Sequence, residues 1–217
     1  MVDDIVGIKF QSESPLLDWE RIHDEWIRNL DEFSRITDGA EIPYVHAEHP
    51  NNTQFVISAS KAGYAAMREM LGGSRGGDAT ARLDICLVSD KTVDLVEAKF
   101  VEFNFDNPSR QRLIADHLKQ ATSQVRQYTN RKSQLLSSGK TVRRVAVSFI
   151  TPFIENQEPL DDKKLQGLLS EIDESQLPDM LSWVFAARMR KFSYWGRVYP
   201  GVIMVAKMTN ADTDSPT

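Results

Sequence analysis

The sequence is poor in cysteine, in long apolar runs and in net positive charge, and each shortage bears on the class of protein. Cys86 is the single cysteine among 217 residues, so neither an intramolecular disulfide nor a zinc site built from several cysteines is available. No stretch reaches 18 consecutive apolar residues, which predicts that no helix spans a membrane. The acidic N-terminus lacks the basic region and apolar run of a secretion signal. We therefore expect a cytoplasmic protein.

The charge of the chain is unevenly distributed. Lys and Arg number 26 against 31 Asp and Glu, a formal net charge of −5, which taken alone argues against a nucleic-acid partner. Residues 1–106 carry 10 basic and 20 acidic side chains, a net −10, whereas residues 107–144 carry 9 basic and 1 acidic, a net +8. Residues 145–217 add 7 basic and 10 acidic, a net −3. The distribution points to a local phosphate-binding surface that the total conceals.

The pattern of apolar residues predicts an α/β protein with a mixed β-sheet flanked by helices. Three-to-four-residue spacing of Trp19, Ile22, Trp26, Leu30 and Phe33 predicts a helix over 18–36. The other segments are assigned from apolar periodicity, β-branched runs and turn residues. Further helices are predicted at 58–71, 109–136 and 160–172, and strands at 82–88, 93–103, 142–150, 181–189 and 198–208.

Two carboxylates and a lysine lie on the predicted hairpin formed by residues 82–103. Alternation places Asp84 on the face opposite Leu83 and Ile85, and places Glu97 and Lys99 together on one face of the second strand. A turn at residues 89–92 pairs residues whose numbers sum to 181, so Asp84 lies directly opposite Glu97. Cβ atoms in such a pair are about 4.5–5.5 Å apart.

Two opposed carboxylates repel each other unless a positive charge lies between them, which favours a divalent metal ion at this point. Mg²⁺ is held by one or two carboxylates together with water and substrate phosphates, and Mn²⁺ is an alternative. Lys99 would add a positive charge beside Asp84 and Glu97, where charge develops on a phosphorus centre. These groups are the ones that hydrolysis of a phosphodiester needs.

The same residues resemble the PD-(D/E)xK nuclease superfamily, which includes restriction endonucleases and RecB-like exonucleases. Asp84 and Glu97-Ala98-Lys99 match its core motif, and Gln124 and Tyr128 match the Q-x-x-x-Y element of the RecB-like branch. The resemblance implies a restriction-endonuclease-like fold in which Asp84 and Glu97 bind Mg²⁺ and Lys99 assists the attacking water. It also implies that Gln124 and Tyr128 support the site or contact substrate. Leu83 stands where the family pattern has proline.

Family members usually supply one more acidic residue from an early helix or strand, and four candidates remain open. They are Glu25, Glu32, Glu48 and Glu69. Glu48 lies in the segment His-Ala-Glu-His, whose residue types can bind a metal ion. The same residue types are also common in an exposed polar turn. Cys86 shares the face of Asp84 but has no activating partner in the sequence, so we expect an inert thiol.

The cations of the third predicted helix are candidates for contacts with nucleic-acid phosphates. They are Arg110, Arg112, Lys119, Arg126 and Arg131. A second group of cations is followed closely by aromatic residues: Arg188, Arg190 and Lys191, then Phe192, Tyr194 and Trp195. Such a segment could stack on single strands or flipped bases. The alternative is a strand and loop at the edge of the core.

The sequence thus predicts a Mg²⁺-dependent deoxyribonuclease with an N-terminal helical elaboration at residues 1–57, a nuclease core at 58–209 and a polar tail at 210–217. The alternative is a catalytically inactive member of the same fold that binds nucleic acid or assembles with other proteins. RNA as substrate, endonuclease or exonuclease action, a homodimer, and a partner in a restriction or anti-phage defence system all remain open.

Overall fold

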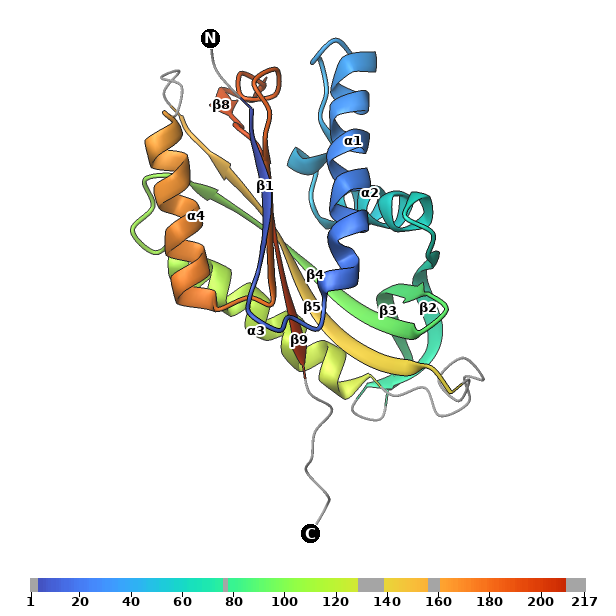
Figure 1. Cartoon of the computed structure of the whole chain (residues 1–217). Helices are drawn as coiled ribbons and strands as arrows, with labels where there is room; N and C mark the ends of the chain where they lie inside the picture. The colour runs from blue at the N-terminus through green and yellow to red at the C-terminus, as the bar shows by residue number, and fades with distance from the viewer. Residues whose placement is uncertain (1–3, 76–77, 129–138, 156–160, 210–217) are drawn as a thin grey trace.

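Figure 1 shows a computed structural model of the chain, which describes residues 4–75, 78–128, 139–155 and 161–209. In these ranges seven strands form one mixed sheet, ordered β1-β6-β9-β5-β4-β3-β2. Strands β4 and β5 run parallel, and the other neighbouring strands run antiparallel. The strands are β1 (Ile5–Phe10), β2 (Ala65–Arg75), β3 (Asp78–Val88), β4 (Thr92–Asn104), β5 (Thr141–Phe153), β6 (Met180–Phe185) and β9 (Val202–Thr209).

Helices cover both faces of the sheet (Figure 1). They are α1 (Glu20–Ile36), α2 (Glu48–Lys61), α3 (Arg110–Gln127) and α4 (Asp162–Gln176), with short 3₁₀ turns η1 (Leu17–Trp19) and η2 (Pro43–Val45). α1 and α2 pack on one face, and α3 and α4 on the other. A small hairpin, β7 (Ser193–Tyr194) and β8 (Arg197–Val198), lies outside the main sheet. The α/β class and the flanked mixed sheet that the sequence predicts are confirmed.

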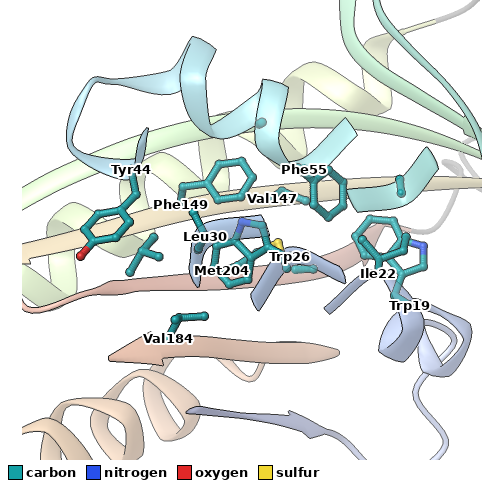
Figure 2. Packing of buried hydrophobic residues seen from close by; sticks show 14 of the residues in the cluster. Trp19, Ile22, Trp26, Leu30, Tyr44, Phe55, Val147, Phe149, Val184 and Met204 are labelled. Carbon is teal, nitrogen blue, oxygen red and sulfur yellow. The ribbon is translucent and has the colours of Figure 1, made fainter. Parts of the chain in front are cut away.

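The larger core lies between the sheet and the α1–α2 layer, as Figure 2 shows. The predicted apolar stripe of α1 puts Trp26 and Leu30 into this core, where both are at most 1% exposed. The ring centroid of Phe149 on β5 lies 6.4 Å from that of Trp26 and 6.0 Å from that of Phe55 on α2. Burying side chains of this size stabilises the fold by about 1.5–3 kcal/mol each. This packing fixes both N-terminal helices against the strands.

One predicted helix is wrong: residues 58–71 do not form a single helix. α2 begins ten residues earlier and ends at Lys61, where Gly63 adopts the positive φ of +96° that favours glycine. The chain then enters β2, whose residues pair with β3 from Ala65–Val88 to Met70–Leu83. Helix propensities differ by less than about 1 kcal/mol per residue, so pairing with a neighbouring strand overrides the alanine- and methionine-rich composition.

Several boundaries also differ from the prediction. α3 ends at Gln127 rather than 136, because Tyr128 has an extended backbone with ψ of 117°. The predicted residues 129–136 and the polar tail lie outside the described residues. β1 was not predicted from the sequence; it pairs with β6 at the edge of the sheet. The predicted domain boundary at 57/58 falls inside α2, and side chains from both sides of it share one core.

Candidate active site

The candidate active site lies where β3 and β4 stop pairing. The observed pairs run from Val88–Val93 to Ile85–Val96, and each sums to 181, so the predicted register is confirmed. Asp84 and Glu97 are the next residues on their strands, one step beyond the last of these pairs. Here the Oδ2 atom of Asp84 accepts a hydrogen bond of 2.9 Å from the backbone N–H of Ala98. At this point a carboxylate therefore takes the place of a strand-to-strand backbone bond.

The ammonium group of Lys99 lies among three carboxylates. Its Nζ atom is 3.3 Å from Oε1 of Glu97, 3.8 Å from Oε2 of Glu48 and 3.9 Å from Oδ2 of Asp84. Nζ also donates a 2.8 Å hydrogen bond to the carbonyl oxygen of Ala98, which fixes its position. The Lys99 side chain is 14% exposed and that of Glu97 only 3%, so these charges interact through a medium less polarisable than bulk water. We call Glu48, Asp84, Glu97 and Lys99 the carboxylate cluster.

Glu48 is the early acidic residue that the structure brings to the other two carboxylates. It is the first residue of α2, and the preceding Ala47 has a positive φ of +88°, so a strained turn sets the direction in which the helix starts. Partial burial raises the pKa of Glu48; Lys99 opposes this shift and the nearby Asp84 adds to it. A raised pKa in a carboxylate beside like charges is typical of a site that gains from a bound cation.

The other three candidate carboxylates form separate ion pairs. Glu25 pairs with Arg28 one turn along α1, and Glu32 lies 3.9 Å from Lys61. Glu69 accepts a 2.9 Å hydrogen bond from Arg82 on the neighbouring strand. Sequence patterns could not select Glu48 among the four, because the choice depends on how α2 packs against β4.

The cluster has the donor types of a divalent metal site but a lysine at its centre. Carboxylate oxygens are the ligands that Mg²⁺ and Mn²⁺ prefer, and Glu48, Asp84 and Glu97 each place one oxygen within 4.0 Å of a single point. Among the described residues, no group of three or more His, Cys, Asp or Glu is arranged to hold a metal ion as it stands. The donor types fit a divalent cation, which would have to displace the Lys99 ammonium from the point that it occupies among the three carboxylates.

Gln124 and Tyr128 lie at the C-terminal end of α3, on the opposite side of the sheet from α2. Tyr128 is fully buried beside Leu83 and Cys86, and its hydroxyl donates a 3.4 Å hydrogen bond to the carbonyl of Met70 on β2. The Oε1 atom of Gln124 is buried with no hydrogen-bond partner in the described part of the chain. The tyrosine therefore supports the strand pair that carries Asp84.

The basic residues of segment 107–144 divide into exposed and internally paired groups. Lys119 and Arg126 are exposed on α3, and Arg112 is 87% exposed with Asp116 3.7 Å away. Arg110 instead makes two hydrogen bonds, of 2.9 and 2.5 Å, to Glu171 on α4 and thereby joins the two helices. Arg131 lies outside the described residues. The positive surface is thus smaller than the net charge of +8 suggests.

Arg143 was counted in the predicted phosphate-binding surface, but it is buried in the structure. Its guanidinium donates two 2.6 Å hydrogen bonds to the fully buried Asp94, and bonds of 2.8 and 2.9 Å to Asp18. Trp19 completes the network with a 2.8 Å bond from its indole to Asp94. Burial opposes the charge of Arg143, but the bonds to Asp94 and Asp18 hold its pKa above the ordinary value. This arginine joins η1, β4 and β5 and is not available to phosphate.

Cys86 has an environment that suppresses thiol chemistry. Burial, with a smaller effect from Asp94, raises the pKa of the Cys86 thiol to about 11. A thiol of that pKa is protonated at neutral pH, which agrees with the expectation of an inert side chain.

Comparisons of the chain with protein-family models, with curated proteins and with solved structures gave no match. In the described residues, no helix is both long and apolar enough to span a membrane.

Proposed function

We propose that the protein is a metal-dependent nuclease that hydrolyses phosphodiester bonds of DNA. One observation carries the proposal: three carboxylates from a helix start and two adjacent strands surround one lysine ammonium, each within 4.0 Å of it. The residues that match the PD-(D/E)xK motif are three of these four. The mixed sheet with helices on both faces agrees with the restriction-endonuclease-like architecture that the motif resemblance implies.

The carboxylate cluster assigns a role to each residue. Glu48, Asp84 and Glu97 would hold Mg²⁺ or Mn²⁺, which when bound lowers the pKa of a coordinated water and draws electrons from the phosphoryl oxygen. The bond between Asp84 and the Ala98 amide fixes one carboxylate at the fork between the strands. Lys99 supplies a positive charge for the phosphate group as negative charge develops on it.

The substrate strand would need positive charge near this cluster. The exposed cations of α3, Arg112, Lys119 and Arg126, remain candidates for phosphate contacts away from the cluster, because α3 covers the opposite face of the sheet from α2. Arg110 would have to give up its bonds to Glu171. DNA is the substrate proposed, and RNA belongs in the same assay. A partner protein, as in a defence system, would supply the targeting, because the described residues form one sheet with its flanking helices and a small hairpin.

The test compares cleavage by the wild type with cleavage by two isosteric variants. Circular single-stranded DNA, plasmid and single-stranded RNA are incubated with Mg²⁺ or Mn²⁺ and, separately, with a chelator. We expect Glu97→Gln and Lys99→Met to lose about 100-fold or more in rate, the usual cost of removing a group that stabilises transition-state charge. Cleavage of circular substrates would identify endonuclease action.

Lys163→Met is the matched control. Lys163 belongs to Asp161-Asp162-Lys163, a second acid-x-Lys triplet, but there Asp161 caps the start of α4 and the lysine is exposed. This variant should cleave at the wild-type rate. Wild-type rates in Glu97→Gln would refute the assignment.

The second candidate function is a catalytically inactive subunit of the same fold. The observation that favours it is the position of Lys99, whose ammonium neutralises part of the carboxylate charge without any metal ion. If no substrate is cleaved with either ion, and Mn²⁺ leaves the thermal stability unchanged, this function replaces the nuclease.

A further inference from the structure

Three aromatic side chains form a stack that runs from the core to solvent along the β7–β8 hairpin. Phe192 is 8% exposed, Tyr194 is 37% exposed and Trp195 is 87% exposed. The ring planes of Phe192 and Tyr194 are inclined by 17°, and those of Tyr194 and Trp195 by 29°, with centroids 6.5 and 5.7 Å apart. We call these three residues the aromatic stack. Its outer ring is nearly free of contacts with the rest of the protein.

Trp195 occupies a backbone position that does not suit it. It forms the hairpin turn with Gly196, and φ is positive at both residues, +52° and +75°. Two-residue hairpin turns of this kind favour Asn-Gly, and a bulky residue with positive φ is an outlier. Because the Trp195 side chain is exposed, it contributes little hydrophobic stabilisation to the fold. Neither turn formation nor core packing therefore explains why tryptophan occupies this position. A strained, exposed aromatic residue points to a binding role.

The hairpin is attached to the elements that carry the carboxylate cluster. Glu102 accepts hydrogen bonds of 2.8 Å from Arg197 and 2.9 Å from the hydroxyl of Tyr199. Glu102 lies three residues beyond Lys99 on β4, a separation of about 10 Å along an extended strand. The ring of His46, two residues before Glu48, packs edge to face with the Tyr194 ring, with the two ring centroids 5.6 Å apart and the planes inclined by 73°. The hairpin that carries the aromatic stack is therefore bonded to the strand that supplies Glu97 and Lys99 and contacts the turn that precedes Glu48.

The shape of the exposed surface suits a nucleobase better than a protein. The other large exposed apolar side chains of the described residues belong to other elements: Leu17, Ile36, Ile57, Met67 and Leu177. The hairpin thus offers one flat ring on a near-parallel stack, whereas a stable protein interface buries about 800 Å² on each partner. Lys191 is exposed next to Phe192 and adds positive charge for a backbone phosphate. Stacked rings with adjacent cations are the usual surface for single strands.

We propose that the aromatic stack binds an unpaired base of the DNA strand whose phosphodiester lies at the carboxylate cluster. This inference rests on the proposed nuclease function and narrows its substrate to single-stranded DNA or to duplex with unpaired ends. An intact duplex keeps its bases stacked on one another and offers no free base to Trp195.

The experiment measures binding of a 12-nucleotide single-stranded DNA in a chelating buffer, where no cleavage is needed. Trp19 and Trp26 are fully buried and Trp183 is partly buried, so Trp195, at 87% exposed, is the tryptophan most accessible to a quencher, and stacking of a base should quench its emission. The emission change should be absent from Trp195→Phe. Trp195→Asn should weaken binding about 5- to 150-fold, the range for loss of one base–aromatic stack. Trp195→Phe should recover most of the affinity. A blunt, self-complementary duplex should bind the wild type no better than it binds Trp195→Asn.

Leu177→Asn is the matched control, because Leu177 is also exposed, at 60%, and also has a positive φ, of +46°. It should bind the oligonucleotide as the wild type does. Both asparagine variants should melt at or above the wild-type temperature, since asparagine tolerates a left-handed backbone. Loss of affinity in Trp195→Asn without loss of stability then reports stacking and not unfolding.

Oligonucleotides with a single abasic position complete the test. One such position should lower the affinity of the wild type and leave that of Trp195→Asn unchanged, because the two changes remove the same contact. Equal affinities of Trp195→Asn and wild type for the intact oligonucleotide would overturn the inference. So would dimerisation that depends on Trp195, because the ring would then contact a second copy of the chain.

The two proposals can fail separately. If Glu97→Gln abolishes cleavage while Trp195→Asn binds normally, the nuclease stands and the aromatic stack has no role in substrate binding. If Trp195→Asn loses affinity but no substrate is cleaved, the stack binds single strands in a protein that is not a nuclease.

Discussion

Two buried acids three residues apart on β4 should differ in how much stability the protein loses when each is replaced by its amide. Asp94 is 0% exposed and accepts three hydrogen bonds, two from Arg143 at 2.6 Å and one from Trp19 at 2.8 Å. Glu97 is 2% exposed but lies with two other carboxylates around one ammonium. We assign Asp94 to stability and Glu97 to function, and acid-to-amide variants test that division.

The expected magnitudes follow from the contacts. In Asp94→Asn an amide N–H₂ faces the guanidinium of Arg143, which is itself only 8% exposed and keeps Asp18 as its charged partner. Breaking a buried ion pair on one side costs about 3–5 kcal/mol. For a chain of this length 1 kcal/mol corresponds to about 2–4 °C, so the melting temperature should fall by about 6–20 °C. Glu97→Gln removes one of several like charges and should change stability by no more than about 1 kcal/mol.

Thermal unfolding followed by circular dichroism at pH 7 measures both variants against the wild type. Replacing the pair together, as Asp94→Leu with Arg143→Met, should recover part of the loss because no unpaired buried charge remains. The reasoning is refuted if Asp94→Asn melts within about 4 °C of the wild type. It also fails if Glu97→Gln loses as much stability as Asp94→Asn.

Two further predictions concern the carboxylate cluster. Mn²⁺ at 100 times its dissociation constant should stabilise the wild type by about 2.7 kcal/mol, or about 5–11 °C, and should leave Glu97→Gln nearly unchanged; equal rises in both would place the ion elsewhere. Burial raises the pKa of Glu48 in the folded state, so its contribution to stability is complete below the ordinary glutamate pKa and is lost as pH rises through the folded value. Glu48→Gln, which cannot ionise, should therefore melt progressively higher than the wild type as pH rises from the ordinary glutamate pKa to the raised folded value, in the absence of metal ions. A constant difference between the two melting curves over that range would contradict this linkage.

Local patterns predicted the part of the fold that depends on near neighbours in the chain. The hairpin register follows from the turn at residues 89–92, since strands joined by a short turn have few alternative pairings. The apolar stripe of α1 likewise predicted which face of that helix is buried. Both signals arise within about 20 residues, and both are confirmed.

Local patterns failed where a distant segment decides the structure. Residues 65–70 have helix-forming composition, yet β3 offers them a strand partner, and their pairing outweighs propensity. Arg143 lies in a basic stretch, yet Asp18 and Asp94 draw it inside. No periodicity or composition within the segment itself indicates either outcome.

The sequence alone predicted that Asp84, Glu97 and Lys99 belong to one hairpin, because the turn at residues 89–92 sets the register of its strands as far as Ile85–Val96. Beyond that pair the strands separate, and the bond from the Ala98 amide to Asp84 is a feature of the tertiary structure. Tertiary structure decided that Glu48 joins them, since it reaches Lys99 only through the packing of α2 on the sheet, 51 positions earlier in the chain. Tertiary structure also decided which cations remain exposed and that Trp195 stands clear of the core. Burial and long-range strand pairing depend on segments that are far apart in the chain. They therefore decide between local conformations that short-range sequence patterns do not distinguish.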